Sequence, residues 1–124
     1  MKSNRILLGL LVASSSAFAA TQHAKGNPKK NIALVYAGPG ACKENCSEAA
    51  ALQAQRLGYE VIYVGPEQKN PQIFKKAAVW IQPGGKSSVV SKNMVEELKE
   101  NIRNFVGNGG AYVGFCAGGF FATS

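Results

Sequence analysis

Cys116 is the residue best placed to do chemistry, because Gly114 and Gly118 flank it two positions away on either side. The segment Ala111–Phe115 before it is short, apolar and partly β-branched, which is typical of a strand buried on both faces. Such a strand, a reactive side chain and small neighbours predict a nucleophile elbow. A helix beginning after Cys116 would favour the thiolate and offer free N–H groups to an oxyanion. The alternative interpretation is a buried structural cysteine in a glycine-rich turn.

The strands needed to position this elbow are four apolar segments of the sequence. They are expected at residues 31–37, 59–64, 77–82 and 111–115. Helical patterns separate them, and strands that alternate with helices predict an α/β domain with a parallel sheet and helices on both faces.

Two helices and one short helical stretch are predicted between the strands. The first helix is expected to begin at Asn45 or Ser47 and to run to Leu57, with Ala50, Ala54 and Leu57 on one face. The short stretch covers residues 70–76. The clearest helix is expected from Ser91 or Asn93 to Gly107, because its apolar residues recur with a helical period: Met94, Val95, Leu98, Ile102, Phe105 and Val106.

Glycine-rich breaks follow three of the predicted strands, at residues 38–40, at residues 83–85 and at the elbow. The carboxyl ends of parallel strands meet at one edge of the sheet, where α/β proteins place their sites. We therefore expect the breaks to converge, although every connection of this kind needs turn residues. The residues expected to line the resulting pocket are Gly38, Pro39, Gly40, Gly84, Gly114, Gly118 and Gly119.

With these residues in view, positions 31–124 resemble the class I glutamine amidotransferase-like superfamily, and within it the N-terminal domain of biotin-protein ligases. The likeness rests on three motifs: Val35–Gly40, Ile81–Gly85 and Gly110–Phe120. It implies a flavodoxin-like three-layer sandwich with Cys116 as nucleophile. It also implies that backbone N–H groups of Gly85 and Ala117 form the oxyanion hole. Biotin ligation itself is not implied, because ligases carry that reaction in a separate domain whose adenylate loop this sequence lacks.

The sequence departs from the superfamily after the elbow. There the family has a catalytic histidine and an acidic partner on later strands, whereas this chain stops at Ser124, its one histidine is His23, and it contains no aspartate. We therefore expect a domain incomplete at its C-terminus. In complete form it would hydrolyse amide or ester bonds of an unspecified small molecule or peptide, and as this fragment it would be inactive. A non-catalytic ligand-binding or interaction module is the alternative, and no cofactor is expected in either case.

Residues 1–19 have the features of a secretory signal peptide, followed by a flexible mature N-terminus at residues 20–30. Lys2 and Arg5 precede a short apolar region, and Ala17–Ala19 forms a small-residue cleavage site. We expect a secreted or periplasmic protein with no stable membrane anchor after cleavage. The formal charge of +7 comes from scattered lysines without a nucleic-acid motif, which predicts a solvated basic surface and no nucleic-acid partner.

Cys42 and Cys46 are four residues apart, and export would place them in an oxidising compartment. They can pair if at least one of them lies outside regular helix. Two free thiols near the mouth of a site are the alternative. A metal site is not expected, because no second cysteine pair or neighbouring histidine completes a zinc set.

The mass of the intact protein from its native producer tests these expectations. We predict a chain beginning at Ala20, lighter by one pair of hydrogens if Cys42 and Cys46 are joined. A chain that retains Met1–Ala19 would contradict signal cleavage, and a mass well above that of the mature sequence would show a longer polypeptide.

Overall fold

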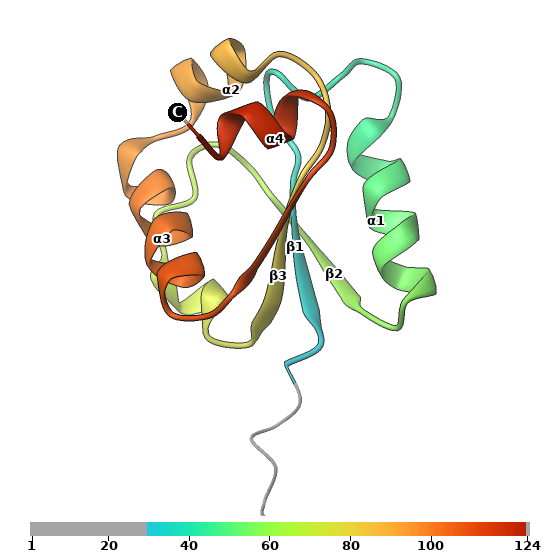
Figure 1. The fold of residues 1–124 in the computed structure, drawn as a ribbon, viewed down its shortest axis with the longest axis vertical. Coiled ribbons are helices and arrows are strands. Elements are labelled where there is room, and N and C mark those ends of the chain that lie inside the picture. Colours follow the sequence, from blue (N-terminus) through green and yellow to red (C-terminus); the bar gives the residue numbers. More distant parts are fainter. Residues whose placement is uncertain (1–29, 124) are drawn as a thin grey trace, which may run out of the picture.

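Four strands form the centre of the structure, and helices alternate with them along the chain (Figure 1). The computed structural model describes residues 30–123. The strands are β1 (Ile32–Tyr36), β2 (Glu60–Val64), β3 (Ala77–Gln82) and β4 (Ala111–Gly114). The helices are α1 (Cys46–Arg56), the 3₁₀ helix η1 (Pro71–Phe74), α2 (Ser87–Asn93), α3 (Glu96–Gly107) and α4 (Ala117–Phe121).

The sheet is entirely parallel, with strand order β2-β1-β3-β4. Leu34 at the centre of β1 is in register with Ile62 on one side and with Trp80 on the other. β1 and β3 are therefore the internal strands of the described sheet, and β2 and β4 are its edges. The predicted α/β domain with a parallel sheet is confirmed.

Alternate side chains of β1 pack against different helices, because successive residues of a strand point to opposite faces of the sheet. Ala33 and Val35 pack in a cluster with α1, and Leu34 and Tyr36 pack in a second cluster with α2, α3 and η1. The residues at the centre of each cluster are almost completely buried. The sheet is thus covered by helices on both faces, and its strands end at a common upper edge in Figure 1.

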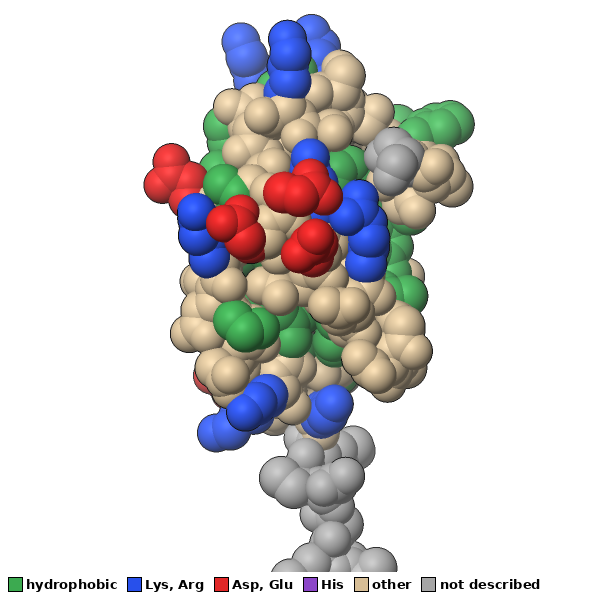
Figure 2. All heavy atoms as spheres, turned by 90° about the vertical axis from the view of Figure 1, so that its left-hand side faces the viewer, with side chains coloured by type: hydrophobic (Ala, Val, Ile, Leu, Met, Phe, Trp, Pro, Cys, Tyr) green, Lys and Arg blue, Asp and Glu red, His purple; other side chains and the backbone are tan. Residues whose placement is uncertain are grey.

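The charged side chains of α3 lie on the outer face of the molecule. Figure 2 shows acidic and basic side chains intermixed there, and Lys69 pairs with Glu97 across a distance of 3.1 Å. Among residues 30–123, no helix is long and apolar enough to cross a membrane. The predicted signal peptide, nearly all of the flexible N-terminus and His23 lie outside the described residues.

The prediction that residues 111–115 are buried on both faces is wrong. Val113 is 40% exposed and Phe115 is 44% exposed, and β4 pairs only with β3 in the described sheet. An apolar sequence shows that a strand can be buried on both faces, but not that it is. Its position in the sheet depends on the order of the strands, which no local pattern encodes.

The predicted start of the clearest helix is also wrong, because two helices occupy that region. Ser91 and Asn93 belong to α2, and α3 begins only at Glu96. Met94 and Val95 between them are extended, and the N–H of Val95 donates to the carbonyl of Pro66 at 3.0 Å. This long-range bond takes a donor that a continuous helix would have used internally.

The first helix differs from its prediction in its buried face and in its cap. Leu57 is 77% exposed, and the buried residues of α1 are Ser47, Ala50, Ala51 and Ala54. Ser47 does not cap the helix, because its buried hydroxyl donates to the carbonyl of Tyr36 at 2.8 Å. Asn45 occupies the cap position in a left-handed conformation without a side-chain cap bond. α1 is therefore anchored to the end of β1 by a hydrogen bond as well as by apolar contact.

The two leucines differ in burial, which gives a direct test of the core. Leu98 is fully buried in the cluster under α3, so Leu98→Ala should lower the free energy of unfolding by about 2–5 kcal/mol. The exposed Leu57→Ala should change it by less than about 0.5 kcal/mol. Chemical denaturation of both variants measures the difference, and equal effects would show that the described core is wrong.

Candidate functional site

Cys116 lies in the sharp turn between β4 and α4, and its backbone is strained. Its φ of 51° and ψ of −116° fall in a region that residues with a side chain rarely adopt, which costs roughly 1–3 kcal/mol. The side chain is exposed and forms no disulfide. A buried structural cysteine is therefore the wrong interpretation. The strand, the strained residue and the following helix have the geometry of a nucleophile elbow.

The two glycines beside Cys116 let α4 approach the sheet closely. A Cβ atom at Gly114 would lie 2.5 Å from the carbonyl carbon of Gly118, and one at Gly118 would overlap the carbonyl oxygen of Gln82. The hydroxyl of Tyr112 donates to the carbonyl of Gly118 at 2.8 Å and fixes the first turn of α4 from below. Small residues at these two positions are thus a packing requirement of the elbow.

The loop after β1 and the turn after β3 are joined by backbone hydrogen bonds. Cys42 N–H donates to the carbonyl of Gly84 at 2.9 Å, and Lys86 N–H donates to the carbonyl of Gly40 at 2.8 Å. Between these bonds Ala41 and Gly85 form an antiparallel pair. A Cβ atom at Gly85 would overlap the carbonyl oxygen of Gly40, so only glycine permits this pairing.

The turn after β3 also contacts the elbow on its other side. A Cβ atom at Gly84 would lie 3.5 Å from the Cβ of Cys116, and the N–H of Phe115 donates to the carbonyl of Gln82 at 3.0 Å. This follows from the strand order, because β3 lies between β1 and β4. The three glycine-rich breaks therefore converge, with Gly84 and Gly85 in the middle.

The backbone N–H groups of Gly84, Gly85, Cys116 and Ala117 have no acceptor within the described part of the chain. The two hydrogen bonds that flank Ala41 and Gly85 leave the N–H of Gly85 directed away from the loop after β1. Ala117 is the first residue of α4, so its N–H has no intrahelical partner. Ala117 directly follows Cys116, and a Gly84 Cβ atom would lie 3.5 Å from the Cys116 Cβ, so unpartnered N–H groups lie around the elbow.

The other predicted pocket residues support the loops and do not enclose a cavity. Pro39 accepts a hydrogen bond from the Tyr36 hydroxyl at 2.9 Å, and Gly38 packs against that ring. Gly40 packs against Val90 of α2 at a φ of 94°. The gap between Gly40 and the first turn of α4 has no room for a water molecule. Gly119 is exposed, so Cys116 lies on a packed surface of three loops.

Gln82 is a buried residue at this site to which the sequence analysis gave no role. Its side chain is fully buried under the elbow and accepts a hydrogen bond from the indole N–H of Trp80 at 3.3 Å. Its side-chain nitrogen has no partner among the described residues, which costs roughly 1–3 kcal/mol. The signal in the sequence was one polar residue at the end of the apolar run of β3.

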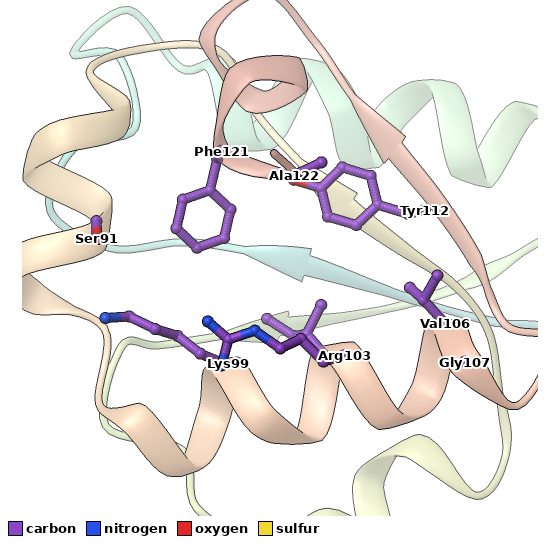
Figure 3. Close-up of a pocket in the computed structure, with 9 residues that line it drawn as sticks. Ser91, Lys99, Arg103, Val106, Gly107, Tyr112, Phe121 and Ala122 are labelled. Atoms are coloured by element: carbon purple, nitrogen blue, oxygen red, sulfur yellow. The ribbon is translucent and has the colours of Figure 1, made fainter. Parts of the chain in front are cut away.

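A cavity of about 500 Å³ lies elsewhere, between α2, α3, β4 and α4. Figure 3 shows Tyr112 and Phe121 on one side of it and Lys99 and Arg103 on the other. Both cations pair with Glu96, and the hydrogen bonds from Arg103 and then from Lys99 hold the pKa of that carboxyl below its usual value. Cys116 does not line this cavity, which is therefore separate from the elbow.

Gly85 and Gly84 form a matched pair for testing the convergence of the loops. Gly85→Ala should lower the free energy of unfolding by at least about 2 kcal/mol, because its φ of 145° and the carbonyl of Gly40 both exclude a side chain. Gly84→Ala should cost less than about 1 kcal/mol, since its methyl group makes ordinary contacts. Equal stability of the two variants in urea would refute the pairing of Ala41 with Gly85.

Two tyrosines that support the loops give the site a pH dependence. Burial raises the pKa of Tyr36 and of Tyr112 to about 12, from 10.0. Because the folded-state values are the higher ones, this stabilisation is complete below pH 10 and is lost as the pH rises towards 12. Unfolding measured across this range should show the loss. The double variant Tyr36→Phe/Tyr112→Phe should flatten the profile, and an unchanged slope would contradict the assignment.

Comparison of the sequence with known proteins identifies a family. The family model described as "Biotin-protein ligase, N terminal" matches residues 31–124. The biotin–protein ligase of Schizosaccharomyces pombe is 38% identical over 47 residues, which cover 38% of this chain and 7% of the ligase. The chain therefore matches a small part of that relative's length. No solved structure matches it significantly.

Proposed function

The chain belongs to the biotin-protein ligase N-terminal family, and from this premise we propose that it is the thiol-bearing part of an enzyme that cleaves amide or ester bonds. The observation that carries the proposal is the exposed Cys116 in a strained turn, where backbone N–H groups have no acceptor among the described residues. Strain of this kind persists where the surrounding structure enforces it, and it is concentrated at active sites. A cysteine that served packing alone would need neither the strain nor the exposure.

The reaction begins with attack of the Cys116 sulfur on a carbonyl carbon. A carbon–sulfur bond forms, the electron pair of the C=O bond moves to oxygen, and the N–H groups of Gly85 and Ala117 donate to that oxygen. Collapse of the tetrahedral intermediate breaks the bond to the amine or alcohol and leaves a thioester on Cys116. Water then hydrolyses the thioester and returns the thiol.

Residues 30–123 contain no histidine, so they lack the residue that most often acts as general base for a cysteine nucleophile. Solvent base can take the thiol proton, but an amide also requires that its leaving nitrogen be protonated. The proposal therefore assigns acylation by activated esters to the residues of this chain. Cleavage of amides would need a further acid or base.

The proposed fold is the flavodoxin-like sandwich. Its strand order of 2-1-3-4-5 begins with the order found here, and it places sites at the carboxyl ends of its strands. We also propose that the protein is exported and acts on a small molecule or peptide outside the cytoplasm. The Cys42–Cys46 disulfide supports this location, because such bonds persist in oxidising compartments.

A binding module on the same fold is the second candidate. The absence of histidine among the described residues favours it. The two candidates differ in what happens to an ester, since a binding module would retain its ligand unchanged.

An activated ester distinguishes them. With p-nitrophenyl acetate we predict one equivalent of nitrophenolate per protein and an acetyl group on Cys116, at a rate roughly 100-fold above that of the urea-unfolded chain. The variant Cys116→Ala should release nitrophenolate only at the background rate of spontaneous hydrolysis and lysine acylation. A rate equal to that of the unfolded chain would mean that the fold does not activate the thiol, and the enzyme proposal would fail.

A further inference from the structure

The Cys42–Cys46 disulfide closes a short bridge between the loop after β1 and the first residue of α1. The two Cα atoms are 5.6 Å apart, within the usual range for a disulfide. Cys42 lies outside helix, Cys46 begins α1, and the intervening Lys43, Glu44 and Asn45 are exposed. Within these three residues the carbonyl of Asn45 accepts a hydrogen bond from the N–H of Ala49 in the first turn of α1 at 2.9 Å, and the disulfide adds a covalent link between Cys42 and α1.

The Cys46 end of the bridge is rigidly held. The Ser47 hydroxyl bonds to the end of β1, and three alanines of α1 pack against the sheet in a buried cluster. Because Cys46 is adjacent to Ser47, its position is fixed by the same contacts. The disulfide passes this constraint on to Cys42.

The Cys42 end of the bridge bonds directly to the turn beside the thiol. Its backbone N–H donates to the carbonyl of Gly84, which precedes the proposed oxyanion donor Gly85. Two consecutive glycines have more accessible backbone conformations than any other pair, so the direction of the Gly85 N–H depends on what holds the turn. A chain of contacts therefore runs from α1 through the disulfide to Gly85, without touching Cys116.

We propose that the Cys42–Cys46 disulfide is a positioning element for acyl transfer at Cys116. It holds the turn at Gly84–Gly85 so that the N–H of Gly85 meets the developing oxyanion. The inference rests on the proposed function and adds a condition to it, because acyl transfer would then require an oxidising compartment. The thiol of Cys116 itself takes no part in the bridge, so reduction would spare the nucleophile and remove a donor.

Two reagents distinguish a change in the reactivity of the Cys116 thiol from a loss of the oxyanion donor in the variant Cys42→Ala/Cys46→Ala. Acylation by p-nitrophenyl acetate forms an oxyanion, whereas alkylation by iodoacetamide displaces iodide and forms none. We expect the acylation rate of the variant to fall at least about 10-fold, since loss of one oxyanion donor costs up to about 10²–10³. The alkylation rate should stay within about 3-fold of the wild type. Equal changes in both rates would overturn the proposal.

The variant Leu98→Ala is the matched control, because it loosens the core on the opposite face of the sheet. It should leave the ratio of the two rates unchanged. If it lowers acylation selectively as the disulfide variant does, general destabilisation is the cause and the positioning role is wrong.

Hydrogen exchange keeps the two proposals distinguishable. The amides of residues 42 and 86, which bond across the two loops, should exchange faster in the disulfide variant, and their unchanged protection would overturn the positioning role. If wild-type acylation does not exceed that of the unfolded chain, the proposed function fails, and the inference fails with it. If the wild type is acylated faster than both the disulfide variant and the unfolded chain, and if the amides of residues 42 and 86 are protected in the wild type alone, both proposals are supported.

Discussion

The contact between two backbones at Gly85 is the constraint on which the site depends. The turn after β3 lies between the loop after β1 and the elbow after β4, and it can touch both only where side chains are missing. The carbonyl of Gly40 occupies the place of a Gly85 Cβ atom, and Cys116 lies within van der Waals distance of a Gly84 Cβ position. A side chain at Gly85 would separate the two loops and disturb the backbone contacts at the elbow.

The chemistry offered by this arrangement is mainly that of the backbone. Residues 30–123 contain neither histidine nor aspartate, and their ion pairs lie on the surface of α3, away from the elbow. What remains at the carboxyl edge of the sheet is a thiol, several backbone N–H groups without an acceptor among the described residues, and the buried Gln82. Membership of the biotin-protein ligase N-terminal family agrees with this picture. The aligned residues cover only 7% of the matched ligase, so its ligation activity is not assigned to this chain.

The sequence predicted those features that depend on local backbone chemistry. The bounds of β3, the glycine-rich breaks and the turn at Cys116 all follow from residue types that only particular conformations accommodate. Features that depend on long-range order were missed. The residues of β4 are more exposed than their apolar run predicts, and the bond from Val95 to Pro66 divides one expected helix into α2 and α3. Gln82 was overlooked because a single polar residue at the end of a strand forms no periodic pattern. Its burial depends on the packing of α4 against the end of β3, which the sequence does not show.

The structure of a covalent adduct tests the central claim most directly. A peptide aldehyde forms a hemithioacetal with a reactive cysteine, and its oxygen occupies the position of the oxyanion. A crystal structure of this adduct should show the Cys116 backbone at positive φ and the adduct oxygen about 2.7–3.1 Å from the nitrogens of Gly85 and Ala117. An adduct whose oxygen points into solvent, with neither nitrogen in reach, would contradict the account.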